Sequence, residues 1–263
     1  FTIPFFLLLN CLSFFDVYGI EVSGSVSGDW TLPNSPYIVT ADATVPDGES
    51  LTIQPGVEIK FRTGSADLFV DGVLNAMGTA ALPISFTTEN PDPAPLQWGS
   101  ILFRNTNGEE VSRLEHCHLS YGSGFRSEMI QINGARVEMR HCEISNSGTI
   151  GINILNANPV IADCQFDDNV SYAMAMTPGA SPSFSGNQAN GNGADVIGLH
   201  GGVITGDVQW VRDTLPYRVI NDVTVLVEGQ LTIAPGVVVE FQDTSDDLFI
   251  DGTLIAEGTE ELP

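Results

Sequence analysis

The sequence predicts an all-β fold in which the chain winds as a solenoid, and two internal repeats lead to that prediction. The phrase LTIQPGVEIKF, which begins at Leu51, recurs as LTIAPGVVVEF at Leu231. At the same constant offset and without a gap, residues 36–83 align with residues 216–263. A shorter repeat occupies the middle of the chain. Self-similarity at fixed periods indicates a repeat architecture.

The local pattern within the long repeat is that of short strands. In SLTIQPGVEIKF, apolar residues alternate with polar ones on either side of a Pro-Gly pair, which is typical of a turn. The stretch DLFVDGVLNAMGT shows the same alternation around a glycine. Short strands interrupted by Gly and Pro at regular spacing favour an all-β fold. The alternating apolar positions of the first stretch are Leu51, Ile53, Val57, Ile59 and Phe61.

The short repeat follows an apolar-x-x-(Cys or Asn)-x-apolar template, and its central residues are Cys117, Cys142, Cys164 and Asn187. The spacing of these positions fits one coil of a solenoid, because each coil buries little alone and stacked coils build a continuous core. Stacked coils bring parallel strands together, and crossovers between parallel strands are right-handed in nearly all proteins. We therefore expect the three cysteines in one inward ladder, as unpaired thiols.

Several of these stretches carry a resemblance to a known family. The segments LTIQPGVEIKF, LFVDGVLNAMGT, WGSILF, LEHCHLSYG and VIADCQFDDN resemble right-handed parallel β-helix proteins of the pectin-lyase-like superfamily. The chain is similar in particular to large secreted bacterial β-helix repeat proteins. The resemblance implies an all-β, right-handed parallel β-helix with about 22–25 residues per coil. It does not imply one activity, because this fold serves lyases, glycosidases, adhesins and surface fibres.

The order of segments predicts three regions. Residues 1–19 are an apolar run followed by small residues, which is typical of a secretory signal peptide, here without an initiator Met or a basic start. We expect residues 20–203 to form a β-helix unit and residues 204–263 to begin a second β-helix module, with the sequence incomplete at both ends. Whether the two form one continuous solenoid is left open. The predicted location is secreted or at the cell surface, with no membrane span in the mature chain.

The amino-acid composition limits the classes of partner that this protein can bind. The formal net charge is −24, and Lys60 is the single lysine. Nucleic-acid binding requires Lys and Arg to neutralise phosphates, so this class is excluded, as is docking on anionic lipid. We predict no cofactor, and calcium binding is the alternative interpretation of the acidic surface. An extracellular glycan or a surface partner remains as the expected ligand.

Three residues resemble part of a glycosidase motif. Asp167 and Asp168 in FDDN, with His200 in LHGG, are similar to the Asp-Asp and His-Gly motifs of polygalacturonase-type enzymes, which use paired carboxylates across a glycosidic bond. The Asn-x-Asp and Arg-x-Lys motifs of those enzymes are not found, and His200 is about a coil and a half from the pair. In the alternative interpretation the two aspartates form a solvated turn and His200 lies in a linker.

A lyase would need a base, usually with calcium held by acidic residues, and a polyuronate substrate would be repelled by an acidic surface. The arginines that lie in a suitable part of the sequence are Arg104, Arg113, Arg126, Arg136 and Arg140.

A metal site is a further hypothesis. His116 and His141 each precede a ladder cysteine and would stack on adjacent coils, and Asp163 takes the equivalent place in the next coil. Stacked histidines with a carboxylate are ligands that zinc accepts. The alternative is an ordinary outward polar ladder. The tryptophans at positions 30, 98 and 210 could stack on sugars, but two of them recur within the long repeat, which favours packing.

Taken together, these patterns predict a secreted or cell-surface β-helix repeat protein with a structural, adhesive or glycan-binding role. The alternative is a polysaccharide-active enzyme, either a polygalacturonase-like glycosidase or a polysaccharide lyase. Whether the protein is an enzyme is left open, with the non-catalytic interpretation favoured. The feature that would separate the two is a cluster of acidic and basic residues on one outward face, which the sequence does not reveal.

Overall fold

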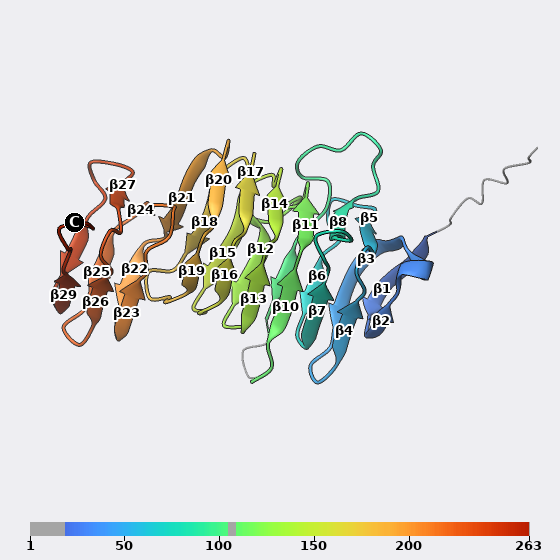
Figure 1. Cartoon of the computed structure of the whole chain (residues 1–263), viewed down its shortest axis with the longest axis horizontal. Coiled ribbons are helices and arrows are strands. Elements are labelled where there is room, and N and C mark those ends of the chain that lie inside the picture. Colours follow the sequence, from blue (N-terminus) through green and yellow to red (C-terminus); the bar gives the residue numbers. More distant parts are fainter. Residues whose placement is uncertain (1–18, 105–108, 263) are drawn as a thin grey trace, which may run out of the picture.

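The computed structural model describes residues 19–104 and 109–262, and the chain forms a long stack of short strands (Figure 1). The predicted signal peptide, except for Gly19, lies outside the described residues. The first strand, β1 (Ile20–Ser25), begins at the predicted mature start. The strands pair in parallel from coil to coil, which confirms the all-β prediction of parallel coils. A 3₁₀ turn, Leu32–Asn34, interrupts the strands.

The stack has three walls, named here by their first and last strands. The β5–β20 wall contains β5 (Glu58–Phe61), β8 (Ile84–Thr88), β11 (Cys117–Ser120), β14 (Glu143–Ser145), β17 (Gln165–Asp167) and β20 (Gln188–Asn190). The β6–β27 wall contains β6 (Leu68–Val70), β9 (Ile101–Phe103), β12 (Glu128–Asn133), β15 (Ile150–Leu155), β18 (Tyr172–Met176), β21 (Ala194–Leu199), β24 (Tyr217–Val219) and β27 (Val239–Phe241). The β2–β19 wall contains β2 (Gly28–Trp30), β4 (Ser50–Ile53), β7 (Val73–Met77), β10 (Ser112–Glu115), β13 (Val137–Arg140), β16 (Val160–Ala162) and β19 (Ser183–Ser185).

The long strand β3 (Tyr37–Val45) joins two of these walls. Its first half pairs with β5 and its second half with β6, so the β5–β20 and β6–β27 walls form one continuous hydrogen-bonded sheet. On its other edge β3 pairs with β1. The single strand β3 is thus the starting point of two walls.

The coil length agrees with the predicted repeat. Leu119 pairs with Ile144, Ile144 with Phe166, and Phe166 with Ala189, so the register of the strands reproduces the spacing of the short repeat. An earlier coil is longer because a loop is inserted, and there Leu68 pairs with Ile101.

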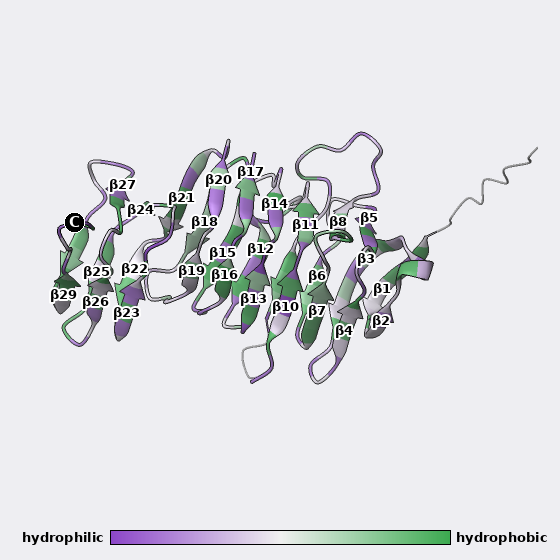
Figure 2. Cartoon of the chain, viewed as in Figure 1, coloured by the Kyte–Doolittle hydropathy of each residue, from purple (hydrophilic) through white to green (hydrophobic). Residues whose placement is uncertain are grey.

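Side-chain alternation places the core inside the coils. In Figure 2 the strands carry hydrophobic and hydrophilic residues side by side, because successive side chains of a strand point to opposite faces. The inward residues of the walls are fully buried, for example Ile59, Leu119 and Ile152. Burial of this apolar surface between stacked coils is what stabilises a solenoid, because no single coil has a core of its own.

The cysteine ladder is confirmed. Cys117, Cys142 and Cys164 are buried free thiols at equivalent positions of three successive coils. Hydrogen bonding between neighbouring thiols, together with burial, raises the pKa of Cys142 and of Cys164. Thiols with raised pKa values are poor nucleophiles, so these cysteines act as small core residues. In the next coil the position belongs to Asn187, which is also fully buried.

The tryptophans pack inside the molecule, as the repeat indicated. Trp30 stacks on Tyr37 and Trp210 on Tyr217, with ring centroids 4.6 and 5.6 Å apart. Trp98 stacks on Phe61 at 4.2 Å. All three indoles are buried, so none offers a ring to a ligand.

The second copy of the long repeat continues the solenoid through one wall only. β24 pairs with β21, but β19 and β20 are the last strands of their walls in the described part of the chain. Two new three-stranded sheets begin instead: β22 (Gly202–Ile204), β25 (Val223–Val225) and β28 (Leu248–Ile250) form one, and β23 (Asp207–Trp210), β26 (Gln230–Ile233) and β29 (Thr253–Ala256) form the other. The predicted boundary between residues 203 and 204 falls within β22, which already pairs with the second copy. The division into two regions stays a prediction.

Candidate functional site

Most of the predicted site residues lie along the β5–β20 wall. His116, His141 and Asp163 occupy the corner that precedes this wall in three successive coils, all in the left-handed region, with φ of 47°, 51° and 53°. Asp and His tolerate this conformation better than most residues. In the following coil Gly186, with φ of 68°, takes the same place. The corner explains why these residue types recur at this step of the repeat.

The two histidines stack on adjacent coils, as predicted. Their ring centroids are 5.0 Å apart with 17° between the planes. No group of three or more His, Cys, Asp or Glu side chains in residues 19–104 and 109–262 could hold a metal ion. The metal hypothesis for His116, His141 and Asp163 stays a prediction.

The Asp167–Asp168 pair divides between a strand and a corner. Asp167 is the last residue of β17, and its Oδ1 accepts a hydrogen bond of 3.0 Å from Gln165 Nε2. Asp168 is exposed and has φ of 54° at the corner that follows the wall. The structure therefore gives the two carboxylates different surroundings on one side of the molecule.

His200 lies elsewhere. It follows β21 on the β6–β27 wall, where its Nε2 is 2.9 Å from Asn153 Oδ1 on β15. The structure does not join His200 to the hydrogen bonds of Asp167 or Asp168. Burial lowers the pKa of His200. His200 lies in the segment that connects β21 to β22, and its half-buried ring contacts Asn153 on β15.

Asn153 also binds Glu128, a carboxylate that the sequence analysis did not select as a site residue. Asn153 Nδ2 donates to Glu128 Oε2 at 3.2 Å, and Gln131 Nε2 donates to Glu128 Oε1 at 2.8 Å. Glu128 is almost completely buried, although it belongs to the outer hydrogen-bonding network of the wall. The chain of contacts thus joins an imidazole, two amides and a carboxylate across three strands.

Near this network lies a cluster of charged groups around one aromatic ring. The guanidinium carbon Cζ of Arg104 lies 4.1 Å from the ring centroid of Phe69, and that of Arg126 lies 5.6 Å from it. Asp71 binds Arg104 through two hydrogen bonds of 2.8 Å, and Asp67 binds Arg126 at 2.7 and 2.9 Å. This is the cluster of acidic and basic residues on one face that sequence reasoning did not find. We call Phe69, Arg104, Arg126, Asp67 and Asp71 the Phe69 cluster.

The ion pair with Asp67 keeps the guanidinium of Arg126 protonated, so Arg126 does not serve as a base. The hydrogen bonds from Arg126 to Asp67 raise the pKa of Arg126, so its guanidinium stays protonated. A lyase base must release its proton near the working pH, which requires the opposite shift. Arg126 is therefore held as a cation, and both guanidiniums lie over an aromatic face, an arrangement stabilised by cation–π attraction.

The other arginine candidates are dispersed. Arg113 lies on β10 with its Nε 3.5 Å from Glu138, and Arg136 is paired with Glu109 at 2.9 Å. Arg140 is the last residue of β13. The β2–β19 wall and its approach carry these three side chains, away from the Phe69 cluster.

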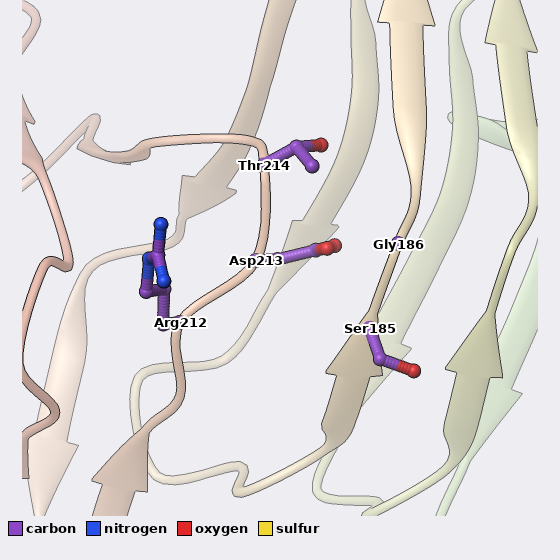
Figure 3. Close-up of a pocket in the computed structure, with 5 residues that line it drawn as sticks. All are labelled: Ser185, Gly186, Arg212, Asp213 and Thr214. Carbon is purple, nitrogen blue, oxygen red and sulfur yellow. The ribbon is translucent and has the colours of Figure 1, made fainter.

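A pocket of about 410 Å³ lies between β19 and the segment that leads into the second copy (Figure 3). Asp213 points toward the segment of Gly186, whereas Arg212 points another way. Asp213 accepts hydrogen bonds from the side chain and backbone N–H of Asn187, at 2.7 and 3.2 Å, and Thr214 donates to the Asn187 carbonyl. These contacts satisfy a buried amide at a point where the two adjoining walls end, which indicates a structural role.

Comparison with known families agrees with this architecture. The family model described as "Right handed beta helix region" matches residues 101–208, and that described as "Pectate-lyase like beta helix domain" matches residues 24–129. The second match contains the whole Phe69 cluster.

No curated protein and no solved structure matches the chain. In the described part of the chain, no helix has the length and apolar character that crossing a membrane requires. The two family matches together cover residues 24–208, and within them the parallel walls repeat coil after coil. The chain is therefore a right-handed parallel β-helix protein.

Proposed function

We propose that this protein is an extracellular β-helix protein that binds a glycan on the outer face of its β6–β27 wall and does not cleave it. The Phe69 cluster carries the proposal. Two guanidiniums lie over the ring of Phe69, so aromatic surface and hydrogen-bond donors meet on one outward face. The family match to a pectate-lyase-like domain supports a polysaccharide-related role for the region that contains the cluster.

The neighbouring side chains add the groups that sugar hydroxyls need. Gln131 and Asn153 lie on adjacent strands of the wall in direct register, and each carries both a donor and an acceptor. Phe69 lies on β6, and the charged residues of the cluster flank strands of the same wall: Asp67 and Asp71 border β6, Arg104 follows β9, and Arg126 precedes β12. Extracellular location is part of the proposal and is supported by the signal-like residues at the start of the sequence.

The protonation state of Arg126 supports the proposal that the protein binds the glycan without cleaving it. The raised pKa of Arg126 removes a base from the cluster. The predicted acid pair lies on another wall, and His200 is bonded to Asn153. A polysaccharide-active enzyme is the second candidate, favoured by the network that joins the buried Glu128 to His200.

The test is binding to soluble neutral plant polysaccharides, with polygalacturonate and alginate as charged comparators, with and without calcium. We expect at least one polysaccharide to bind and Phe69→Ala to weaken it about tenfold. Phe249→Ala is the matched control, because Phe249 is the equivalent residue of the second copy and no cation–π contact is found at it in the described residues.

The outcomes separate the candidates. Absence of binding to every polysaccharide, or equal loss in both variants, contradicts the proposal. New reducing ends that vanish in Asp167→Ala or Asp168→Ala would favour the glycosidase. Unsaturated products that vanish in Arg104→Ala or Arg126→Ala would favour the lyase.

A further inference from the structure

A second pocket on the β6–β27 wall lies where the second copy meets the coils that precede it. It measures about 320 Å³, near the lower end of the range for ligand pockets. Its lining includes Val170, Ser171 and Tyr172 from the first unit, and Arg218 and Gln242 from the second copy. We call it the junction pocket.

The junction pocket combines the groups that recognise a sugar ring. Tyr172 supplies an aromatic face, and its hydroxyl donates to Gln242 Oε1. Ser171 supplies a hydroxyl, and the amide of Gln242 retains its two N–H donors. Val170 is exposed beside them and adds apolar surface. A ligand with one apolar face and a rim of hydroxyls satisfies all of these groups.

The charge of the junction pocket favours a neutral sugar as the ligand. Arg218 is the single charged residue of the lining, and both its Nε and one terminal nitrogen bind Glu240 Oε2, at 3.1 and 2.8 Å. The positive charge is therefore compensated within the protein. A sugar carboxylate would have to compete with Glu240 for the guanidinium, whereas neutral hydroxyls would not.

Between the Phe69 cluster and the junction pocket, neighbouring side chains cover most of the outward row of the wall: Leu102, Asn153 and Ala175 are 3%, 7% and 0% exposed. In the outward row of the wall, Phe69 is followed by Leu102, Gln131, Asn153, Ala175, Gly198 and Arg218, all in direct register. A Cβ atom built at Gly198 would lie 3.5 Å from the Tyr172 ring, so this ring covers the glycine. Six strand steps of about 4.8 Å put Arg218 about 29 Å from Phe69 along the row.

We infer that the junction pocket is a second sugar subsite, and that one neutral glycan chain of several sugars contacts it and the Phe69 cluster together. This inference rests on the proposed function. Two subsites on one ligand act as linked binding events, so the affinity rises once the ligand is long enough to reach both. The subsite needs both parts of the chain, because its aromatic ring comes from a middle coil and its guanidinium from the second copy.

The experiment measures the affinity for cello-, xylo- and manno-oligosaccharides of increasing length, by calorimetry, with the full chain. We expect affinity to rise about tenfold or more when the oligosaccharide becomes long enough to span both subsites. In Tyr172→Ala this rise should vanish while short oligosaccharides bind as they do to the parent. Tyr172→Phe keeps the ring and should retain most of the rise.

Two further variants keep the inference falsifiable. Gln242→Ala changes an exposed side chain of the pocket and should reduce the rise even if Tyr172→Ala fails to fold. Phe69→Ala should weaken binding at every length. If the parent binds and depends on Phe69, but the junction variants bind long oligosaccharides as the parent does, the second subsite is wrong and the proposed function stands. If no oligosaccharide binds the parent, both are overturned.

Discussion

The two copies of the long repeat have the same pattern of residues and different burial. Phe61 of the first copy is fully buried, whereas the equivalent Phe241 is 48% exposed. Leu74 is likewise 0% exposed and Leu254 is 41% exposed. Both copies form strands at the equivalent places. Strand formation therefore follows from the local pattern, and burial depends on which coil stacks on top.

The difference has a direct structural cause. In the first copy β8, β9 and β10 pair with β5, β6 and β7 and cover their inward residues. In the second copy, β27, β28 and β29 are the last strands of their sheets in the described part of the chain. Because a solenoid is stabilised by contacts between neighbouring coils, the same side chain contributes more in the covered copy.

The largest expected effect on the free energy of unfolding separates the equivalent residues Phe61 and Phe241. Phe61→Ala removes a buried ring that stacks on Trp98 and should lower the free energy of unfolding by about 3–5 kcal/mol. Phe241→Ala should cost less than about 1 kcal/mol, because half of its ring is already in water. Urea unfolding of both variants measures the difference, and equal losses would show that exposure does not set the cost.

An aspartate pair should show an intermediate effect. Asp67 is buried, and its carboxylate accepts the backbone N–H of Ser100 and two bonds from Arg126. Asp67→Ala leaves these donors without a partner, at a cost of about 2–4 kcal/mol. Asp247, the exposed equivalent, should tolerate Ala within about 0.5 kcal/mol. A similar fall of the thermal midpoint in both variants would contradict this interpretation.

The smallest effect concerns His200, at the position equivalent to Ile20 of the first copy. Burial lowers its pKa in the folded protein, so the unfolded chain binds the proton more readily. The stability that depends on neutral His200 is fully present above the unfolded pKa of about 6.5 and is lost as the pH falls from there through the lowered pKa of the folded state. His200→Gln keeps a donor for Asn153 and should lose less stability between about pH 7.5 and 5.5 than the parent. Parallel pH profiles of unfolding would contradict this expectation.

Much of the fold could be predicted because its signals are local and repeated. The spacing of Cys117, Cys142 and Cys164 appears in the register of the strands, and the cysteines are buried as expected. The stacked histidines were also predictable, since equivalent positions of successive coils lie one strand spacing apart. The candidate site was not predictable in this way. Phe69 and Arg126 are far apart in the sequence, in coils of unequal length, and no fixed step connects them.

The sequence by itself determined the strands, the coil length, the parallel stacking and the inward rows of apolar residues. These follow from alternation along a strand and from a period that the chain repeats. The tertiary structure decided which outward side chains meet: Asp67 with Arg126, Glu128 with Asn153, and Asn153 with His200. It also decided that the second copy continues one wall and leaves two, which created the junction pocket. The physical reason is that inward positions are fixed by the hydrophobic pattern, whereas outward contacts depend on the lengths of the loops between coils, for which the sequence has no periodic signal.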